Sequence, residues 1–463
     1  MTLKSFTRSF RRGLGGAIIE LSEKPNREEY RNVVMRSSLK DIAYDAQTEG
    51  TKGFYLYTAI NTFSNPDMFL DRIAEKFSKR LYWGLSEQLF DLLCCFAADG
   101  YEKAGNALEK KYDGLKRRLP LMRSFNCGYC ERELLEKLMM RKISGGFESF
   151  KRCVNDMGKM IKQRGRNDCL WCDMFLSAAE EKFGNRIYSF IESSENEFVA
   201  AFSQAYNKAG SESAGRSNLK LMNANDFAQL YKTEPQADKE ETVTVELLIK
   251  RAEELSKEDN PFPLRISLYA KKFARMAEKK DIDRLAEFIF DEELDFMKAA
   301  LLRTFNYVDF PLDIKLLFAY MKSGNESIRE VTAKALSRFK DREIHSLALQ
   351  LFDAGQVENA LTLLEPNFEI DDEALIRKHV LRSKRLSFNM VKSITSIYNS
   401  FKSGSCGDIL LHFYKNTECT HCRFAVVETM IYNGVIPQSI LEECRYDSYE
   451  DTRNLAKNAL TGK

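Results

Sequence analysis

The sequence contains little proline and histidine, and it has no long apolar run. Only nine of its 463 residues are proline and 44% are hydrophobic, so the chain has the composition of a folded protein. Four histidines leave few candidates for general acid–base catalysis near neutral pH. No stretch approaches the roughly 18 apolar residues of a membrane-spanning helix, so we expect no membrane association.

Familiar catalytic motifs are also missing. The sequence contains no GxSxG, no HExxH, no GxxxxGK[ST], and no strand followed by a GxGxxG turn. The glycine-rich run at residues 13–16 lacks both the preceding strand and the spacing of a dinucleotide-binding turn. We therefore expect a non-enzymatic protein.

Charge and cysteine content restrict the compartment and the partners. The net charge of +2 is too small for wholesale attraction to nucleic acid or acidic membranes, so electrostatic arguments must be local. The basic opening at residues 4–12 is followed by an apolar stretch, 13–19, that is too short for a signal peptide. We expect a cytoplasmic protein in which the 11 cysteines serve packing, metal binding or reactivity rather than a disulfide framework.

Apolar residues recur with helical spacing along almost the whole chain, whereas strict alternation is scarce, which predicts an all-α fold. Two helices are expected within residues 28–63 and three within 67–119. Residues 297–305 and 331–339 match at an offset of 34, with Ala299/Ala333, Leu302/Leu336 and Phe305/Phe339 in register. Such a match indicates stacked helical hairpins.

The second half of the chain carries a family resemblance. Residues 326–341 resemble the second helix of a HEAT repeat, with Arg329 at the usual basic position, and residues 446–460 match through Asp447 and Arg453. The resemblance covers about residues 264–462 and implies an α-solenoid of HEAT-like helical hairpins with a concave binding surface. Residues 355–365 also resemble part of a tetratricopeptide repeat, which would imply the same kind of surface.

Composition divides the chain into four parts. We predict an N-terminal helical domain at 1–120, a Cys-rich basic helical insertion at 121–207, a linker at 208–242 and a HEAT-like domain at 243–463. The linker prediction depends on residues 208–218, whose small polar side chains cannot pack a core.

Two CxxC pairs form the sharpest local signal. Cys127 with Cys130, and Cys169 with Cys172, could supply four thiolates to one structural zinc ion, although the pairs lie farther apart than in compact zinc ribbons and fingers. The alternatives are core packing and redox activity. A weaker candidate set for a metal consists of Cys406, His412, Cys419, His421 and Cys422.

Two segments carry local positive charge. Residues 141–166 have eight basic side chains and two acidic ones, and residues 377–407 have no acidic side chain before Asp408. Each segment is either an ordinary solvated surface or a site for an anionic partner. In the second segment, Asp371–Glu373 and nearby acids could instead neutralise the basic residues. The candidate residues for binding an anion or nucleic acid are Arg377, Lys378, Arg382, Lys384, Arg385 and Lys392.

Three functional hypotheses follow. The leading one is a non-enzymatic helical-repeat scaffold that binds a protein partner through its concave surface. The alternative is a HEAT-like protein that binds nucleic acid through segments 141–166 and 377–402. The third is an enzyme similar to the HEAT-like DNA glycosylases that act on alkylated purines, with Trp83 and Glu87 placed one helical turn apart.

Overall fold

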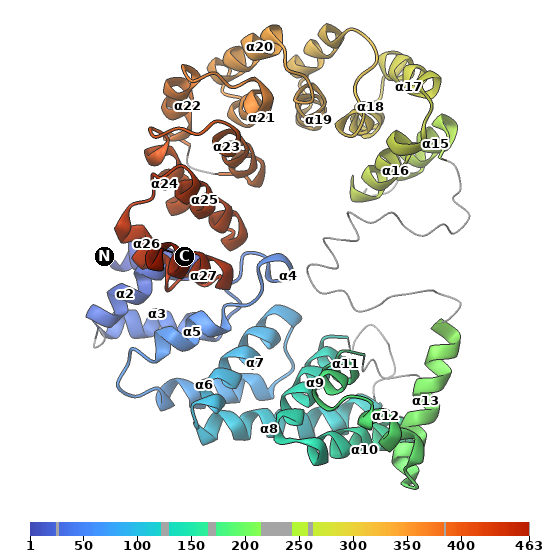
Figure 1. The fold of residues 1–463 in the computed structure, drawn as a ribbon, viewed down its shortest axis with the longest axis vertical. Helices are drawn as coiled ribbons and strands as arrows, with labels where there is room; N and C mark the ends of the chain where they lie inside the picture. Colours follow the sequence, from blue (N-terminus) through green and yellow to red (C-terminus); the bar gives the residue numbers. More distant parts are fainter. Residues whose placement is uncertain are drawn as a thin grey trace. The chain divides into compact units, whose positions relative to one another are not determined.

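The computed structural model describes residues 1–24, 27–121, 129–164, 173–213, 243–257, 263–383 and 386–462. Within these ranges it contains 26 α-helices and no strand, which confirms the all-α prediction (Figure 1). None of the described helices is long and apolar enough to span a bilayer. The described residues separate into two compact units: unit 1 holds those up to Ser213 together with Glu442–Asn454, and unit 2 holds 243–441 together with 455–462.

Unit 1 is built from thirteen described α-helices and one large apolar core. The predicted pair within 28–63 corresponds to α3 and α5, and the predicted three within 67–119 to α6, α7 and α8. The bounds are α1 (Leu3–Arg12), α2 (Gly15–Glu23), α3 (Glu28–Ser38), α4 (Ala46–Glu49), α5 (Gly53–Ile60), α6 (Asp67–Ser78), α7 (Trp83–Ala98), α8 (Glu102–Arg118), α9 (Tyr129–Lys142), α10 (Phe147–Arg164), α11 (Asp173–Phe183), α12 (Arg186–Ser193) and α13 (Glu197–Ser213), with 3-10 turns η1 (Leu119–Leu121) and η3 (Ile143–Gly145).

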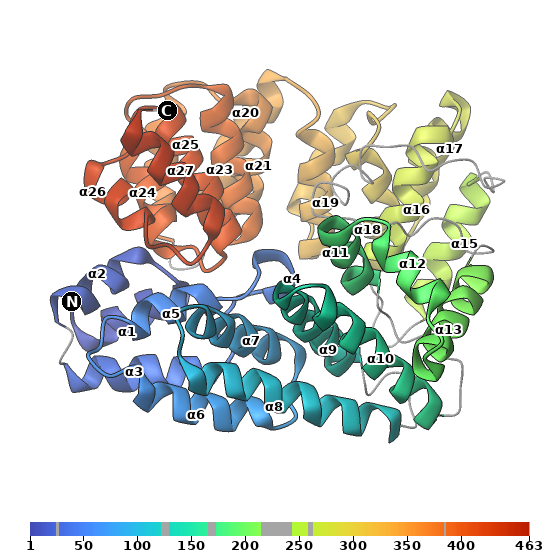
Figure 2. The same cartoon turned by 60° about the horizontal axis from the view of Figure 1, so that its bottom comes forward.

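Close helix packing in unit 1 depends on a glycine. Helices α10 and α13 pack against each other, and Figure 2 shows them side by side. A Cβ atom at Gly158 of α10 would lie 1.8 Å from the carbonyl oxygen of Phe198 in α13. Any larger residue would therefore force the two helices apart.

The glycine-rich run near the start of the chain receives the backbone of residues 443–448. Gly13 has φ of +78°, and its carbonyl oxygen accepts a 2.9 Å hydrogen bond from the Ser448 N–H. A Cβ atom at Gly15 would lie 1.8 Å from the carbonyl oxygen of Glu443. These glycines thus permit a close approach between segments from opposite ends of the sequence, a role that sequence spacing does not reveal.

The described residues of unit 2 likewise form helices and the segments that connect them. Its helices are α15 (Val245–Ser256), α16 (Pro263–Met276), α17 (Lys279–Asp291), α18 (Asp295–Leu302), α19 (Glu326–Leu336), α20 (Arg342–Asp353), α21 (Val357–Asn367), α22 (Asp372–Val380), α23 (Phe388–Ser400), α24 (Gly407–Asn416) and α25 (Thr420–Tyr432), with 3-10 turns η4 (Arg303–Asn306), η5 (Ile314–Phe318) and η6 (Tyr320–Lys322). Helices α26 (Gln438–Cys444) and α27 (Glu450–Thr461) contribute residues to both units.

Five helices of unit 2, which we call the row helices, pack in succession: α18 on α19, α19 on α21, α21 on α23 and α23 on α25 (Figures 1 and 2). They begin at Asp295, Glu326, Val357, Phe388 and Thr420, so their starts are almost evenly spaced along the chain. Helices α20 and α24 each pack against the row helix that follows them. The row thus advances by one helix at a nearly constant interval of sequence.

The residues matched in the sequence lie in adjacent row helices. Ala299 and Leu302 are buried in α18, and Ala333 and Leu336 are buried in α19. The offset of the sequence match is longer than the interval between the starts of α18 and α19 by nearly one helical turn. Both alanines still face the interior, because a shift of about one turn roughly preserves the face of a helix.

Two buried asparagine side chains form hydrogen bonds with backbone groups of preceding segments of the chain. Asn367, at the end of α21, accepts a hydrogen bond from Asp341 N–H (2.7 Å) and donates to the carbonyl of Phe339 (3.1 Å). Asn433 follows α25 and does the same for Ser403 N–H (2.8 Å) and the carbonyl of Tyr398 (2.9 Å). Each side chain therefore satisfies polar backbone groups at or beyond the end of an earlier helix.

Arginine occupies the fourth position of α19, α25 and α27. Arg329 donates to the carbonyl of Ser323 (2.6 Å), and Arg453 donates to the carbonyl of Asp447 (2.9 Å), in each case six positions upstream. Arg423 occupies the same position in α25 and is fully buried. The HEAT-like resemblance identified in the sequence includes Arg329 and Arg453 but not Arg423.

Candidate functional site

The solvent-facing side of α19, α21, α23 and α25 forms a polar surface, which we call the row face. Its members share partial or full exposure on the side of each helix that does not pack into the core. We define it by Glu330 and Lys334 of α19, Glu358 and Glu365 of α21, Asn389, Lys392 and Ser396 of α23, and Glu428 of α25.

Hydrogen bonds join the helices across this face. The Asn389 side chain donates to Glu358 Oε1 at 2.7 Å and reaches Glu330 Oε1 at 3.5 Å. The Ser393 hydroxyl donates to Glu365 Oε1 at 2.6 Å. These bonds join α23 both to α21 and to α19, so the polar groups that form them are held in fixed positions.

The row face carries negative charge at its α19–α21 end. Burial tends to raise the pKa of Glu330, but the 2.7 Å ion pair with Lys334 and the charge of Arg303 outweigh that effect and lower the pKa below its ordinary value. Glu330 is therefore ionised at neutral pH. Three carboxylates and one lysine occupy this part of the face, which favours a basic or amide-rich ligand over phosphate.

The positions of Glu358 and Asn389 in their helices could have predicted this hydrogen-bond network, but apolar periodicity alone does not. Glu358 and Asn389 both occupy the second position of a row helix. Once the interval between row helices is known, the two residues fall at the same end of neighbouring helices. The longer offset taken from the sequence match does not align them.

Four of the six candidate anion-binding residues lie within the described part of the chain. Lys378, Arg382 and Lys392 are exposed. Arg377 already donates to Asp408 (2.8 Å), Glu373 (3.0 Å) and the carbonyl of Ser405 (2.7 Å). The hydrogen bond to Asp408 is the main cause that raises the pKa of Arg377. Lys384 and Arg385 lie outside the described residues.

The acidic block upstream contains two buried carboxylates, those of Asp372 and Glu373, whereas Glu369 and Asp371 are exposed. Asp372 is buried and contacts His345 Nε2 at 2.9 Å, while Glu369 N–H donates to it at 2.8 Å. Glu373 is buried too, and it accepts from Arg377 and from the Ser403 hydroxyl (2.7 Å). Glu373 is thus paired with a basic residue of segment 377–407, whereas Asp372 is satisfied by groups outside that segment.

Only one ligand of the predicted zinc site can be placed. Cys130 lies half-buried in the first turn of α9, and Cys127, Cys169 and Cys172 lie outside the described residues. Helix α11, which begins directly after Cys172, packs against α9, and Phe175 N–H of its first turn donates to Glu136 of α9 at 2.9 Å. The helices that follow the two CxxC pairs are therefore neighbours, and the zinc site stays a prediction.

The second cysteine–histidine set lies entirely within the described residues. No group of three or more His, Cys, Asp or Glu side chains suited to a metal ion occurs in the described ranges. Cys419 Sγ instead caps α25 by accepting from Cys422 N–H at 3.5 Å, and Cys406 is buried, which raises the pKa of its thiol to about 11. These cysteines have packing and capping contacts in unit 2.

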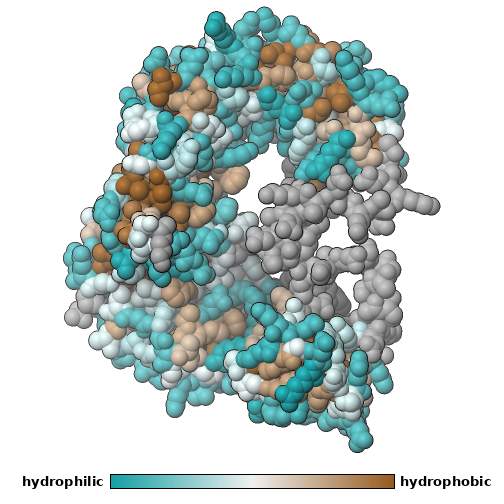
Figure 3. All heavy atoms as spheres, viewed as in Figure 1, coloured by the Kyte–Doolittle hydropathy of each residue, from teal (hydrophilic) through white to brown (hydrophobic). Residues whose placement is uncertain are grey.

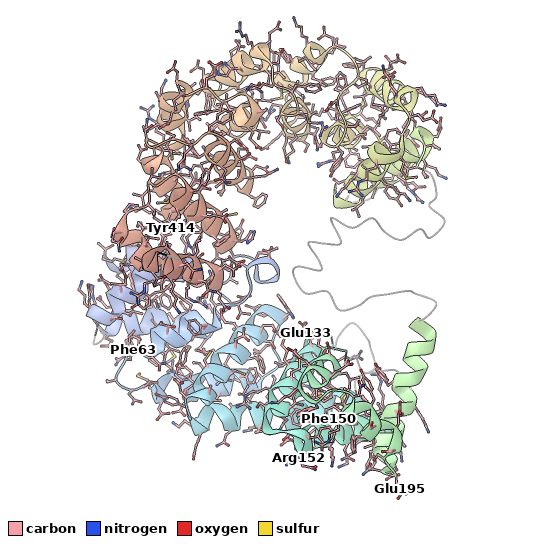
Figure 4. The ribbon with its side chains drawn as sticks, in the orientation of Figure 1. Phe63, Glu133, Phe150, Arg152, Glu195 and Tyr414 are labelled. Atoms are coloured by element: carbon pink, nitrogen blue, oxygen red, sulfur yellow. The ribbon has the colours of Figure 1, made fainter. Side chains whose placement is uncertain are left out.

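A polar pocket of about 790 Å³ lies in unit 1 between the end of α7, α8, the end of α9, η3 and the start of α10. Four basic residues of its wall are Lys116, Arg141, Lys142 and Arg152, three of them from segment 141–166. Figure 4 labels Arg152 at the outer edge of α10 and Phe150 in the interior. The basic segment identified in the sequence therefore contributes to a concave site rather than only to a solvated helix.

Trp83 and Glu87 take part in an internal polar network. The Trp83 indole N–H donates to Glu133 at 2.8 Å, and Glu87 is buried against Lys137, with which it forms an ion pair. Burial raises the pKa of Glu133 and lowers that of Lys137. Neither Trp83 nor Glu87 lines the polar pocket of unit 1.

Comparison with protein-family models, with curated proteins and with solved structures found no match.

Proposed function

We propose that this protein is a non-enzymatic helical-repeat scaffold that binds a protein partner through the row face. In this proposal the hairpins of unit 2 are HEAT-like repeats, and the row helices form the concave side of an α-solenoid. The observation that carries the proposal is the nearly constant interval at which α18, α19, α21, α23 and α25 follow one another while packing in succession. Such stacks present one continuous surface to a ligand.

The charge of the row face favours a protein over nucleic acid. Glu330, Glu358 and Glu365 are fixed by hydrogen bonds at one end of the face, where they would repel phosphate. A partner segment carrying lysine, arginine or side-chain amides could bond to the same carboxylates. Figure 3 shows hydrophilic side chains over much of the described part of the molecule in this view, with apolar patches between them.

The alternative is nucleic-acid binding through segments 141–166 and 377–402. It is supported by the exposure of Lys378, Arg382 and Lys392. Arg377 supports it less, because its guanidinium is occupied by Asp408 and Glu373. Binding of this kind would weaken steeply as salt rises, in proportion to the number of phosphates contacted.

The test uses charge changes on the row face. Ser396→Arg in α23 and Glu428→Lys in α25 change solvent-facing positions of the face, and Ser346→Arg in α20 is a matched control on a helix outside the row. Full-length protein would be used to capture partners from its native host. We expect the partner to be retained by the wild type and the control and lost by the double variant. Equal capture by all three, or recovery of nucleic acid alone, would overturn the proposal.

A structural zinc ion in unit 1 is part of the same proposal. It would be held by Cys127, Cys130, Cys169 and Cys172 and would fix the ends of the Cys-rich insertion. The support is the packing of α9 on α11 described above.

A further inference from the structure

The polar pocket of unit 1 contains more positive charge than its own acids neutralise. Its wall includes three carboxylates, Glu109, Asp113 and Asp156. Lys116 pairs with Asp113 at 3.0 Å and with Asp156 at 2.8 Å. Lys142 forms an ion pair with Glu109. Two lysines therefore account for all three acids of the wall.

The two arginines of the wall bond to neutral groups. Arg152 donates to the Ser149 hydroxyl at 3.0 Å. Arg141 lies against the Cys94 thiol, whose pKa is raised by burial and lowered in part by this guanidinium. Among the described residues, neither guanidinium forms an ion pair within 4.0 Å. Glu148, on the same helix as Arg152, pairs with Lys151 at 2.7 Å; this hydrogen bond is the main cause that lowers the pKa of Glu148, and the charge of Arg152 adds a smaller effect. The permanently charged guanidinium groups of Arg141 and Arg152 thus line the same cavity.

We propose that this pocket binds the phosphate group of a small phosphorylated molecule, with Arg141 and Arg152 holding the phosphate oxygens. Guanidinium groups bind phosphate through paired N–H donors, and a dianion matches two of them, whereas a single carboxylate would leave one unmatched. Ser144, Gly145 and Ser149 add small polar groups beside the start of α10, whose N-terminal end favours negative charge.

The size and the remaining wall indicate that the ligand is larger than phosphate alone. A volume of about 790 Å³ falls in the range of small-molecule sites. Cys94, Ala98 and Cys153 supply apolar surface on which an organic portion could pack. The phosphate could also come from the inorganic ion or from a nucleic-acid backbone, and the experiment separates these sources.

The experiment measures thermal stability of the full-length protein in inorganic phosphate, in glycerol 3-phosphate, with a single-stranded oligonucleotide, and in sodium chloride of equal ionic strength. The variants are Arg141→Gln and Arg152→Gln. The control is Lys110→Gln, an exposed lysine of α8 that does not line the pocket. Because Arg152 is exposed, its substitution leaves the fold intact even if Arg141→Gln proves destabilising.

We expect both phosphate compounds to raise the melting temperature of the wild type and of Lys110→Gln, with tighter binding of glycerol 3-phosphate. Each arginine variant should bind roughly tenfold more weakly, the usual loss for one charged hydrogen-bonding partner. Equal binding of the two compounds would overturn the organic part of the ligand and leave inorganic phosphate held by the two arginines. The whole proposal is overturned if the wild type shows no shift, if Arg152→Gln binds as well as the wild type, or if only a single-stranded oligonucleotide stabilises the protein.

Discussion

Replacement of Asn433 by alanine tests whether the hydrogen bonds of the buried asparagines to distant backbone groups stabilise unit 2. The substitution removes the partner of Ser403 N–H (2.8 Å) and of the Tyr398 carbonyl (2.9 Å). The third bond of this side chain, to the carbonyl of Thr429, is backed by the Asn433 N–H and matters less. Leaving a buried backbone group without a partner costs about 1–3 kcal/mol, so we expect a loss of about 3 kcal/mol.

Hydrogen–deuterium exchange can localise this loss. A destabilisation of about 3 kcal/mol should accelerate exchange in peptides covering residues 398–406 roughly one hundredfold, since each 1.4 kcal/mol is about a factor of ten. Asn399→Ala, at an exposed position of α23, is the matched control and should leave exchange unchanged. Asn367→Ala should give a similar acceleration around residues 339–341. The reasoning is refuted if Asn433→Ala behaves like Asn399→Ala.

Three other predictions concern different parts of the chain. Gly15→Ala places a Cβ atom against Glu443 and should make residues 443–448 accessible to proteolytic cleavage. The control Gly105→Ala, whose Cβ atom meets nothing within 4 Å, should leave the free energy of unfolding unchanged or raise it by up to about 1 kcal/mol. Equal protease resistance of the two variants would contradict this prediction. Burial lowers the pKa of Lys111 to about 8, so between pH 8 and its unfolded value near 10.5 the unfolded chain binds more protons. The unfolding free energy of the wild type relative to Lys111→Met should accordingly rise with pH by up to about 3 kcal/mol, and a flat difference would show that Lys111 titrates normally. Purified protein should carry about one zinc, and Cys130→Ser should lower both the zinc content and the melting temperature; protein free of zinc with an unchanged melt would disprove the site.

Helices and buried stripes could be predicted because they depend on local periodicity. Ala333 and Leu336 recur in register with Ala299 and Leu302 in the sequence match, and all four residues are buried. The three helices expected within 67–119 are present, because each repeats apolar residues at helical spacing. Gly100, with φ of +87°, marks the break between the second and the third of them.

Contacts between distant segments could not be predicted in the same way. The role of Gly15 depends on the backbone of Glu443, and the 2.9 Å contact of Asp372 depends on His345 in another helix. No local pattern specifies which surfaces meet, since the same amphipathic helix can pack against many partners. The pocket of unit 1 likewise depends on the packing of α8, α9 and α10, which lie apart in the sequence.

The most direct test of the proposed function is hydrogen–deuterium exchange of the full-length protein with and without the partner captured from its host. If the row face is the binding surface, protection should concentrate in residues 388–400 and 420–432, together with α19 and α21. Protection confined to residues 141–164 or 377–383, or no protection in the row helices, would contradict the scaffold proposal.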